Sequence, residues 1–289
     1  MVHYGKPSMP GTLYVVGTPI GNLEDISARA LRVLSSVSVI AAEDTRRTRK
    51  LLAHFGLSTP LVSFHAHSDH GELPDILGRL ASGSDVALVS DAGMPCISDP
   101  GTELVAAARQ AGFAVDVVPG PSALTTVLAI AGIRSNETCF IGFAPRNAVD
   151  RRTSFSSLAR SGGSVVMFES PDRVNVCLKD VYRYFGERQI CVARELTKLH
   201  QEVVFGSTEE LSRRGVTAMG EIAIVVGPAQ EGSAASSVPD QAVLRSQFGE
   251  LTEKLGFRRR DAIAELAKQH GVSTRVMYGL VQEALKSGE

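Results

Sequence analysis

The sequence predicts an α/β protein made of two α/β domains, with a small helical domain at the carboxyl end. Runs rich in Val, Ile and Leu alternate with amphipathic stretches over residues 11–133. A second α/β block at 134–229 has sparser helices, and a small, polar linker at 230–241 leads into a basic, helix-turn-helix-like region at 242–289. At 289 residues, the chain can bury two or three hydrophobic cores.

In the first block the strand-like runs show little polar alternation, which is typical of strands buried on both faces of a mostly parallel sheet. Amphipathic helices between these runs indicate an open, doubly wound domain. The expected strands are 12–17, 37–42, 61–65, 85–90 and 114–118, and the expected helices are 27–34, 46–55, 72–81, 102–111 and 122–131.

In the second block two successive strands, 189–194 and 202–205, are too close in sequence for a crossover helix, which predicts a mixed sheet. The other expected strands are 138–143, 164–169 and 221–226, and the expected helices are 149–159 and 173–185.

The composition is that of a globular protein, with 44% hydrophobic and 21% charged residues. A formal net charge of −1 predicts neither a nucleic-acid nor a membrane partner from global charge, so any basic surface must be local. The four cysteines form no CxxC pair, and the amino terminus lacks an apolar signal segment. We therefore expect a cytoplasmic protein with no metal and no membrane partner.

In open α/β sheets, ligands bind beyond the carboxyl ends of the strands, and the unusual loops of the first block fall there. The loop SDAGMPCISDPG at 90–101 holds two prolines and two aspartates, and it would expose backbone groups to an adenosine-sized ligand. The loop VPGPSA at 118–123 supplies a second rigid backbone edge. A structural turn without a ligand is the alternative for the longer loop.

Two further loops at this edge have open interpretations. The loop GTPIGNLED at 17–25 lacks a GxGxxG or phosphate-loop pattern, and it is either a tight turn into a capped helix or a ligand contact. At the next strand end, Glu43 and Asp44 precede Arg46 and Arg47. These charges are either a helix cap with a solvated run or a polar wall facing a substrate.

Histidines and charged strand ends supply the remaining candidates in the α/β region. His65 and His67 could bind the same metal ion, with His70 nearby in the sequence. No further residues complete a tetrahedral set of ligands, so a polar loop is favoured. In the second block, charges follow two strands, at FESPDR (168–173) and RELTK (194–198). A Glu–Arg ion pair within each segment is the structural alternative to a functional role.

The carboxyl-terminal region has the spacing of a helix-turn-helix, with a basic helix at 257–267, a turn ending at Ser273 as N-cap, and a helix at 274–285. Local basic residues favour contact with an RNA backbone, and the alternative is a docking or dimerisation bundle. The basic residues are Arg258, Arg259, Arg260, Lys268 and Arg275.

In this order the motifs resemble the tetrapyrrole methylase superfamily, the class III S-adenosylmethionine methyltransferases, over about residues 11–229. The DAG and PGPSA elements are similar to the whole superfamily, whereas EDTR, ESPxR and RELTK resemble its ribosomal RNA branch rather than its porphyrin branch. The segments are GTPIGNLED (17–25), AEDTRRTRKLL (42–52), SDAGMPCISDPG (90–101), VPGPSA (118–123), FESPDRV (168–174) and ARELTK (193–198).

The resemblance implies a homodimer that holds S-adenosylmethionine in a cleft between the two α/β domains, largely through backbone contacts. It also implies 2′-O-methylation of a cytidine ribose in the decoding centre of 16S rRNA in the 30S subunit. The implied cofactor residues are Ser90, Asp91, Ala92, Gly93, Ile97, Ser122 and Ala123, with Phe143, Met167 and Phe168 covering the adenine.

A ribose 2′-hydroxyl is a weak nucleophile at neutral pH, so a general base should assist, with an effect of about 10²–10⁴-fold. The charged candidates at the strand ends are Glu43, Asp44, Glu169, Glu195 and Lys198, of which Lys198 and Glu169 are favoured. A lysine would need burial or a cationic neighbour to lower its pKa, and Arg46 and Arg194 could supply that charge or hold phosphates.

Two other functions fit parts of the sequence. A methyltransferase of the same superfamily could act on a porphyrinoid or another small molecule, but the basic tail and the pairs Arg46–Arg47 and Arg151–Arg152 favour RNA. A helix-turn-helix regulator that binds DNA and senses a ligand with its α/β body is the non-enzymatic alternative.

Overall fold

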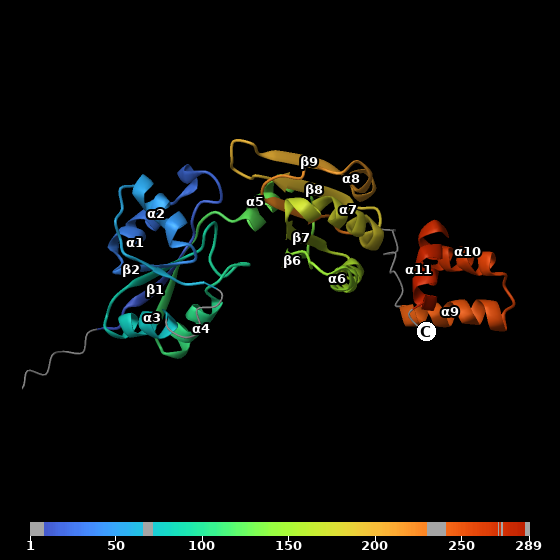
Figure 1. The fold of residues 1–289 in the computed structure, drawn as a ribbon, viewed down its shortest axis with the longest axis horizontal. Helices are drawn as coiled ribbons and strands as arrows, with labels where there is room; N and C mark the ends of the chain where they lie inside the picture. Colours follow the sequence, from blue (N-terminus) through green and yellow to red (C-terminus); the bar gives the residue numbers. More distant parts are fainter. Residues whose placement is uncertain (1–8, 66–71, 230–240, 271, 273, 287–289) are drawn as a thin grey trace, which may run out of the picture. The chain divides into compact units, whose positions relative to one another are not determined.

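The structure is a computed structural model that describes residues 9–65, 72–229, 241–270, 272 and 274–286. The chain divides into two compact units. Figure 1 labels most of their helices and strands. Unit 1 comprises Met1–Thr126 together with Leu196–Gln201, and unit 2 comprises Val127–Glu195 together with Glu202–Glu289. The limits that the sequence predicts for its four segments stay a prediction.

Unit 1 contains the parallel sheet that the sequence predicts, with strand order β3-β2-β4-β1-β5. Its strands are β1 (Thr12–Val16), β2 (Val39–Ala42), β3 (Leu61–Ser63), β4 (Val86–Val89) and β5 (Ala114–Val118). Its helices are η1 (Leu23–Asp25), α1 (Ala28–Ser36), α2 (Thr45–His54), α3 (Glu72–Ala81), α4 (Thr102–Gln110) and the start of α5 (Ala123–Ala131). The predicted elements of this block are all present, with ends that shift by one or two residues.

Helices cover both faces of this sheet, α1 and α2 on one and α3 and α4 on the other (Figure 1). Strands β2 and β4 are buried along their whole length, as predicted. The same prediction is wrong for β5, whose Val117 is 50% exposed. The reason is topological, because β5 lies at the edge of the sheet and has a neighbouring strand on one side only.

Unit 2 contains the predicted mixed sheet, in the order β6-β7-β10-β8-β9. The pair β6–β7 is parallel and the other pairs are antiparallel. Its elements are β6 (Thr138–Phe143), α6 (Ala148–Ser161), β7 (Ser164–Glu169), α7 (Pro171–Phe185), β8 (Gln189–Arg194), β9 (Glu202–Ser207), α8 (Thr208–Arg214) and β10 (Ile222–Val226). The sequence reasoning missed α8, because a seven-residue helix shows too little apolar periodicity.

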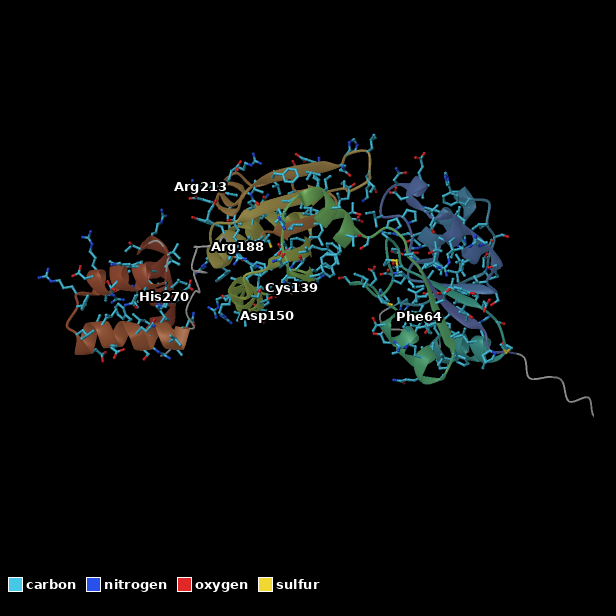
Figure 2. All side chains as sticks on the ribbon, turned by 180° about the vertical axis from the view of Figure 1, so that it is seen from behind. Phe64, Cys139, Asp150, Arg188, Arg213 and His270 are labelled. Atoms are coloured by element: carbon cyan, nitrogen blue, oxygen red, sulfur yellow. The ribbon has the colours of Figure 1, made fainter. Side chains whose placement is uncertain are left out.

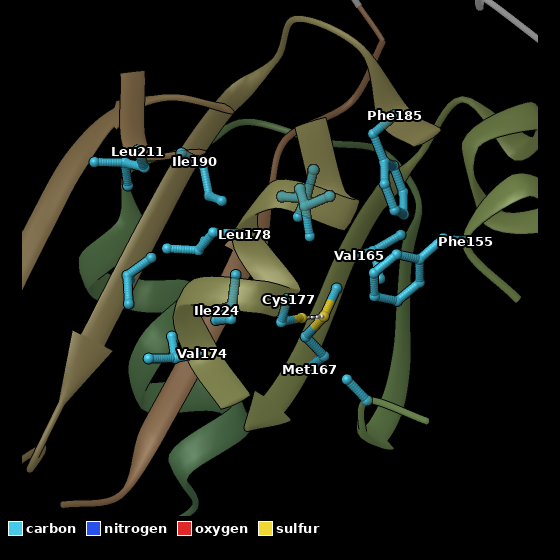
Figure 3. Close-up of a cluster of buried hydrophobic side chains, with 14 of the residues drawn as sticks. Phe155, Val165, Met167, Val174, Cys177, Leu178, Phe185, Ile190, Leu211 and Ile224 are labelled. Atoms are coloured by element: carbon cyan, nitrogen blue, oxygen red, sulfur yellow. Dashed lines mark hydrogen bonds between the residues drawn. The ribbon is translucent and has the colours of Figure 1, made fainter. Parts of the chain in front are cut away.

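The core of unit 2 lies between one face of this sheet and α6, α7 and α8 (Figure 3). Arg188, labelled in Figure 2, is 2% exposed at the rim of this core. Its guanidinium donates to the carbonyl oxygens of Ala159 (2.9 Å), Phe185 (3.2 Å), Gly163 (3.3 Å) and Gly227 (3.3 Å). One buried cation therefore satisfies four carbonyls at the carboxyl ends of α6, α7 and β10, and burial lowers its pKa.

The carboxyl-terminal helices of unit 2 have a hydrophobic core of their own, which includes Phe248, Leu266 and Met277. These helices are α9 (Gln241–Gly249), the π-helical turn η2 (Glu250–Lys254), α10 (Arg259–Gln269) and α11 (Thr274–Lys286). Both predicted helices of this region are present, and α9 adds a third. The predicted N-cap, Ser273, lies outside the described residues. Within the described ranges, every helix is too short or too polar to cross a bilayer.

Candidate functional site

The candidate site lies at the carboxyl edge of the unit 1 sheet. Strands β2, β4, β1 and β5 are neighbours in that order, and parallel strands end at the same edge. The loops that follow them therefore lie side by side: 43–44, 90–101, 17–22 and 119–122.

Main-chain hydrogen bonds join the loops after β1 and β4. The N–H of Thr18 donates to Gly93 O (2.8 Å), and the N–H of Gly93 donates to Thr18 O (3.1 Å). The Thr18 hydroxyl donates to Ser90 O (3.3 Å), and both Thr18 and Ser90 are buried. Ser90 and Gly93, both predicted cofactor residues, thus form part of a small bridge between two loops.

Two glycines bring the loops after β1 and β5 together. A Cβ atom on Gly17 would lie 2.7 Å from Gly120 Cα and 2.6 Å from Met94 Sδ. A Cβ atom on Gly120 would meet the Gly17 backbone at 2.9 Å. Only residues without side chains allow this approach, so three loops form one continuous backbone surface.

The loop after β4 is held in an unusual backbone conformation. Cys96 (φ 69°) and Ser98 (φ 66°) occupy the left-handed region, as does Gly101 (φ 126°). For a residue other than glycine, this conformation costs on the order of 1–3 kcal/mol and persists only where the surroundings enforce it. Between the two strained residues, Ile97 is 43% exposed and offers an apolar contact.

The charged residues after β2 brace this loop. Asp91 accepts a hydrogen bond from the Asp44 N–H (3.0 Å) and pairs with Arg47 Nη1 (3.2 Å), and its own N–H donates to Glu43 Oε2 (3.3 Å). Asp44 caps α2 by accepting from the Arg46 N–H (2.8 Å) and pairs with the Arg46 guanidinium (2.8 Å). Hydrogen bonds from Arg46 lower the pKa of Asp44. The capping interpretation is confirmed, and a catalytic role for Glu43 or Asp44 stays a prediction.

Asp99 is a member of this site that sequence reasoning missed as a titratable group. Burial raises its pKa to about 6, assisted by the negative charges of Glu43 and Asp91 and opposed by a hydrogen bond from Ser90. Perturbed carboxyl groups of this kind are typical of functional sites. The residue type alone carries no such signal, because the shift depends on burial.

The described residues fit the cofactor that the resemblance implies. The loops that carry the implied cofactor residues are joined through their backbones, by the Thr18–Gly93 bridge and by the close approach of Gly17 and Gly120. Asp91, Ala92, Ser122 and Ala123 are partly exposed, whereas Gly93 is buried. Cofactor contacts through these residues stay a prediction.

Lys198 belongs to unit 1, although it lies between two strands of the unit 2 sheet in sequence. Its loop, Leu196–Gln201, packs against Gly21 in the loop after β1. A Cβ atom on Gly21 would lie 2.5 Å from Lys198 Cγ and 2.8 Å from Thr197 Oγ1. The structure therefore brings this catalytic candidate to the same edge as the cofactor candidates of unit 1.

Glu169 is completely buried, on the face of the unit 2 sheet that carries the helices. Its carboxylate pairs with Arg173 and accepts from the Ser170 N–H (2.7 Å). A general base must come within about 2.6–3.2 Å of the oxygen whose proton it removes, and this carboxylate has no exposed surface in the structure. Its burial therefore favours the ion-pair alternative, and the catalytic role stays a prediction.

The second charged strand end pairs differently from the sequence expectation. Arg194 Nε lies 2.5 Å from Glu202 Oε2 on the neighbouring strand, whereas Glu195 Oε1 accepts from the Glu221 N–H (2.9 Å). Arg194 and Glu202 are directly opposite in the β8–β9 ladder, which explains the choice of partner.

The residues predicted to cover an adenine fall on opposite faces of the unit 2 sheet. Met167 is fully buried in the core, with its sulfur 4.0 Å from that of Cys177 (Figure 3). Neither its side chain nor its backbone is exposed in the structure, and its predicted contact with the cofactor stays a prediction. Phe168 faces the other way and forms edge-on contacts with Phe143 (5.8 Å) and with Phe140 (5.0 Å), an aromatic residue that the sequence reasoning missed. Phe143 is 58% exposed.

The basic residues of the carboxyl-terminal helices are exposed, as RNA contact would require. Arg258, Arg259 and Arg260 are at the start of α10, and Arg275 is at the start of α11. The Arg259 guanidinium lies 5.8 Å from the ring centroid of Phe248, which limits its freedom. Of the histidines at 65, 67 and 70, the structure describes only His65, which is exposed.

Comparison with known proteins shows extensive similarity. A family model described as Tetrapyrrole (Corrin/Porphyrin) Methylases matches residues 12–212. The ribosomal RNA small subunit methyltransferase I of Halalkalibacterium halodurans is 40% identical over 286 residues, 97% of this chain and 98% of its own. The protein of the same name from Thermotoga maritima is 48% identical over 200 residues, 69% of this chain and 90% of its own.

Solved structures show the same fold at low sequence identity. Uroporphyrin-III-C-methyltransferase from Thermus thermophilus has a TM-score of 0.52 and 22% identity, covering 75% of this chain and 94% of its own. A putative diphthine synthase from Entamoeba histolytica has a TM-score of 0.55 and 14% identity, covering 76% and 94%. At these identities the likeness concerns the fold alone.

Proposed function

The chain belongs to the tetrapyrrole methylase family, and we propose that it methylates the RNA of the small ribosomal subunit with S-adenosylmethionine as donor. The observation that carries this proposal is the similarity to ribosomal RNA methyltransferases over nearly the whole chain. The target we propose is the ribose 2′-hydroxyl of a cytidine in the decoding centre of 16S rRNA. Action on a ribosomal subunit would take place in the cytoplasm.

The backbone surface around Gly17, Gly93 and Gly120 is proposed to hold the cofactor, with further contacts from the start of α5. When bound, S-adenosylmethionine would supply an activated methyl group. The main task of the protein is then to align this methyl group with the attacking oxygen, and such positioning can lower the activation barrier by ~7–11 kcal/mol. The bridged and strained loops support this role, because they are held in one conformation before a ligand arrives.

Lys198 is proposed to accept the proton of the 2′-hydroxyl. Its location against the loop after β1 and the burial of Glu169 both support this assignment over the other favoured candidate. To act as a base near neutral pH, the amine must lose part of its affinity for protons through burial or positive neighbours. A contribution of about 10²–10⁴-fold to the rate is expected from such a group.

The exposed arginines are proposed to bind RNA phosphates. Arg46, with 83% of its side chain exposed, would act at the edge of the site, and the arginines of α10 and α11 would supply further phosphate contacts. We also propose a homodimer, which the exposed apolar side chain of Val117 on the edge strand β5 supports. Light scattering coupled to size-exclusion chromatography would measure the mass.

Labelled S-adenosylmethionine and 30S subunits from a strain that lacks the modification test the proposal. We expect label in 16S rRNA at a single cytidine, resistant to alkaline cleavage on its 3′ side because the 2′-oxygen is blocked. Label in a porphyrinoid and none in rRNA would contradict the proposal. Lys198→Ala should lose turnover and keep affinity for S-adenosylhomocysteine, whereas a loss of that affinity would refute its catalytic role.

A further inference from the structure

The loop that carries Lys198 is held in a strained conformation. Glu195 (φ 51°) and Thr197 (φ 67°) both occupy the left-handed region, and neither is glycine. For a β-branched residue such as threonine this is a marked outlier, with a cost on the order of 1–3 kcal/mol. Contacts around the loop must offset this cost.

Gln201 supplies the contacts that close the loop. Its side-chain Oε1 accepts a hydrogen bond from the Thr197 N–H (2.6 Å), and its backbone N–H donates to Lys198 O (3.1 Å). The two bonds bracket Lys198, because they hold the N–H of Thr197, the residue before it, and the carbonyl of Lys198 itself. The Thr197 hydroxyl does not share this task, since its buried oxygen makes no hydrogen bond in the structure.

Gly21 limits where the Lys198 side chain can lie. An added Cβ atom would come within 2.5 Å of Lys198 Cγ and 2.9 Å of Leu196 O. The φ angle of Gly21 is not positive, so the position calls for glycine because of space and not because of backbone conformation. Any larger residue would displace the stem of the lysine.

We propose that Gln201 and Gly21 are positioning residues for Lys198, one fixing its backbone and the other leaving room for its side-chain stem. This inference rests on the proposed function, in which Lys198 accepts the proton of the substrate hydroxyl. A displacement of about 1 Å at a reacting group can cost on the order of 10²-fold in rate. The strained loop therefore fixes the position of the Lys198 amine.

The test uses the full-length protein with 30S subunits and compares Gln201→Met, Gln201→Glu and Gly21→Ala. Gln201→Met removes the acceptor, and we expect kcat to fall at least tenfold, with KM for the subunit and affinity for S-adenosylhomocysteine within about twofold of wild type. Gln201→Glu keeps an oxygen acceptor and should retain most of kcat. Gln110→Met and Gly78→Ala are matched controls, since Gln110 is exposed and an added Cβ on Gly78 would touch nothing.

A double-mutant cycle separates positioning from a merely structural role. If Gln201 acts through Lys198, then Gln201→Met should have no further effect on kcat in a Lys198→Ala background. Independent, multiplicative losses would overturn the proposal.

A readout without turnover is limited trypsin cleavage after Lys198, which we expect to be at least fivefold faster in Gln201→Met at an unchanged melting temperature. Unchanged cleavage together with unchanged kcat would also overturn the inference. A wild-type protein that transfers no methyl group to 30S subunits would instead overturn the proposed function. If Gly21→Ala fails to fold, the Gln201 variants still test the proposal, because Gln201 is exposed.

Discussion

Replacing Gly17 with alanine should uncouple the three loops at the sheet edge and weaken cofactor binding. The new Cβ atom would lie 2.7 Å from Gly120 Cα and 2.8 Å from Gly120 N. Carbon atoms in contact are normally about 3.5–4.0 Å apart, so the loop after β5 must retreat by roughly 0.8 Å. Overpacking of this kind costs about 1–3 kcal/mol, because the backbone of Gly120 cannot turn aside as a side chain could.

The measurement is titration calorimetry with S-adenosylhomocysteine. If the bound state carries the whole of that cost, affinity should fall by roughly 5- to 150-fold, because ~1.4 kcal/mol corresponds to tenfold. Gly78→Ala, in the open surface of α3, should bind as wild type and be slightly more stable. Affinity of Gly17→Ala within twofold of wild type, in a folded protein, would refute the idea that these loops act as one cofactor surface.

Three further predictions concern stability and RNA binding. Arg188→Met leaves four carbonyls without their donor and should lower the free energy of unfolding by at least about 3 kcal/mol in urea titrations. The control Arg213→Met breaks an exposed ion pair and should change the free energy of unfolding by less than about 1 kcal/mol. The pKa of Asp99 is raised to about 6, so its ionisation lowers the free energy of unfolding as pH rises from about 4 through about 6. In thermal melts above pH 6.5, Asp99→Asn should therefore be more stable than wild type by roughly 1 kcal/mol, after allowance for partial exposure. At about pH 4 the two proteins should have almost the same stability. Alanine at all three arginines of 258–260 should raise KM for the 30S subunit and flatten its salt dependence without lowering kcat at saturation, and an unchanged salt slope would exclude phosphate contacts there.

Periodicity and loop position predicted most of the fold. Strands such as β7 and β8 begin and end where the sequence indicates, because long apolar runs and the turn residues around them leave little choice. The exposure of β5 could not be predicted in the same way. It depends on strand order, which local sequence does not determine.

The candidate site was predicted less completely than the fold. The loops at the carboxyl edge were identified from their composition, and Lys198 does lie with them. The pairing of Arg194 with Glu202 could not be foreseen, because it depends on strand register. The burial of Glu169 depends on which sheet face α7 covers, and the proposed role of Gln201 depends on two hydrogen bonds within a loop.

The assignment of Leu196–Gln201 to unit 1 has a consequence for the synthesis of the protein. About 70 residues separate Thr126, where the main part of unit 1 ends, from Leu196, which completes it. At about 5–20 residues per second, translation of these residues takes several seconds, during which the carboxyl edge of the parallel sheet lacks the loop Leu196–Gln201. Fragments that stop before residue 196 should therefore retain the parallel sheet and lack a wall of the site, and so should be poor substitutes for the whole chain in ligand-binding studies.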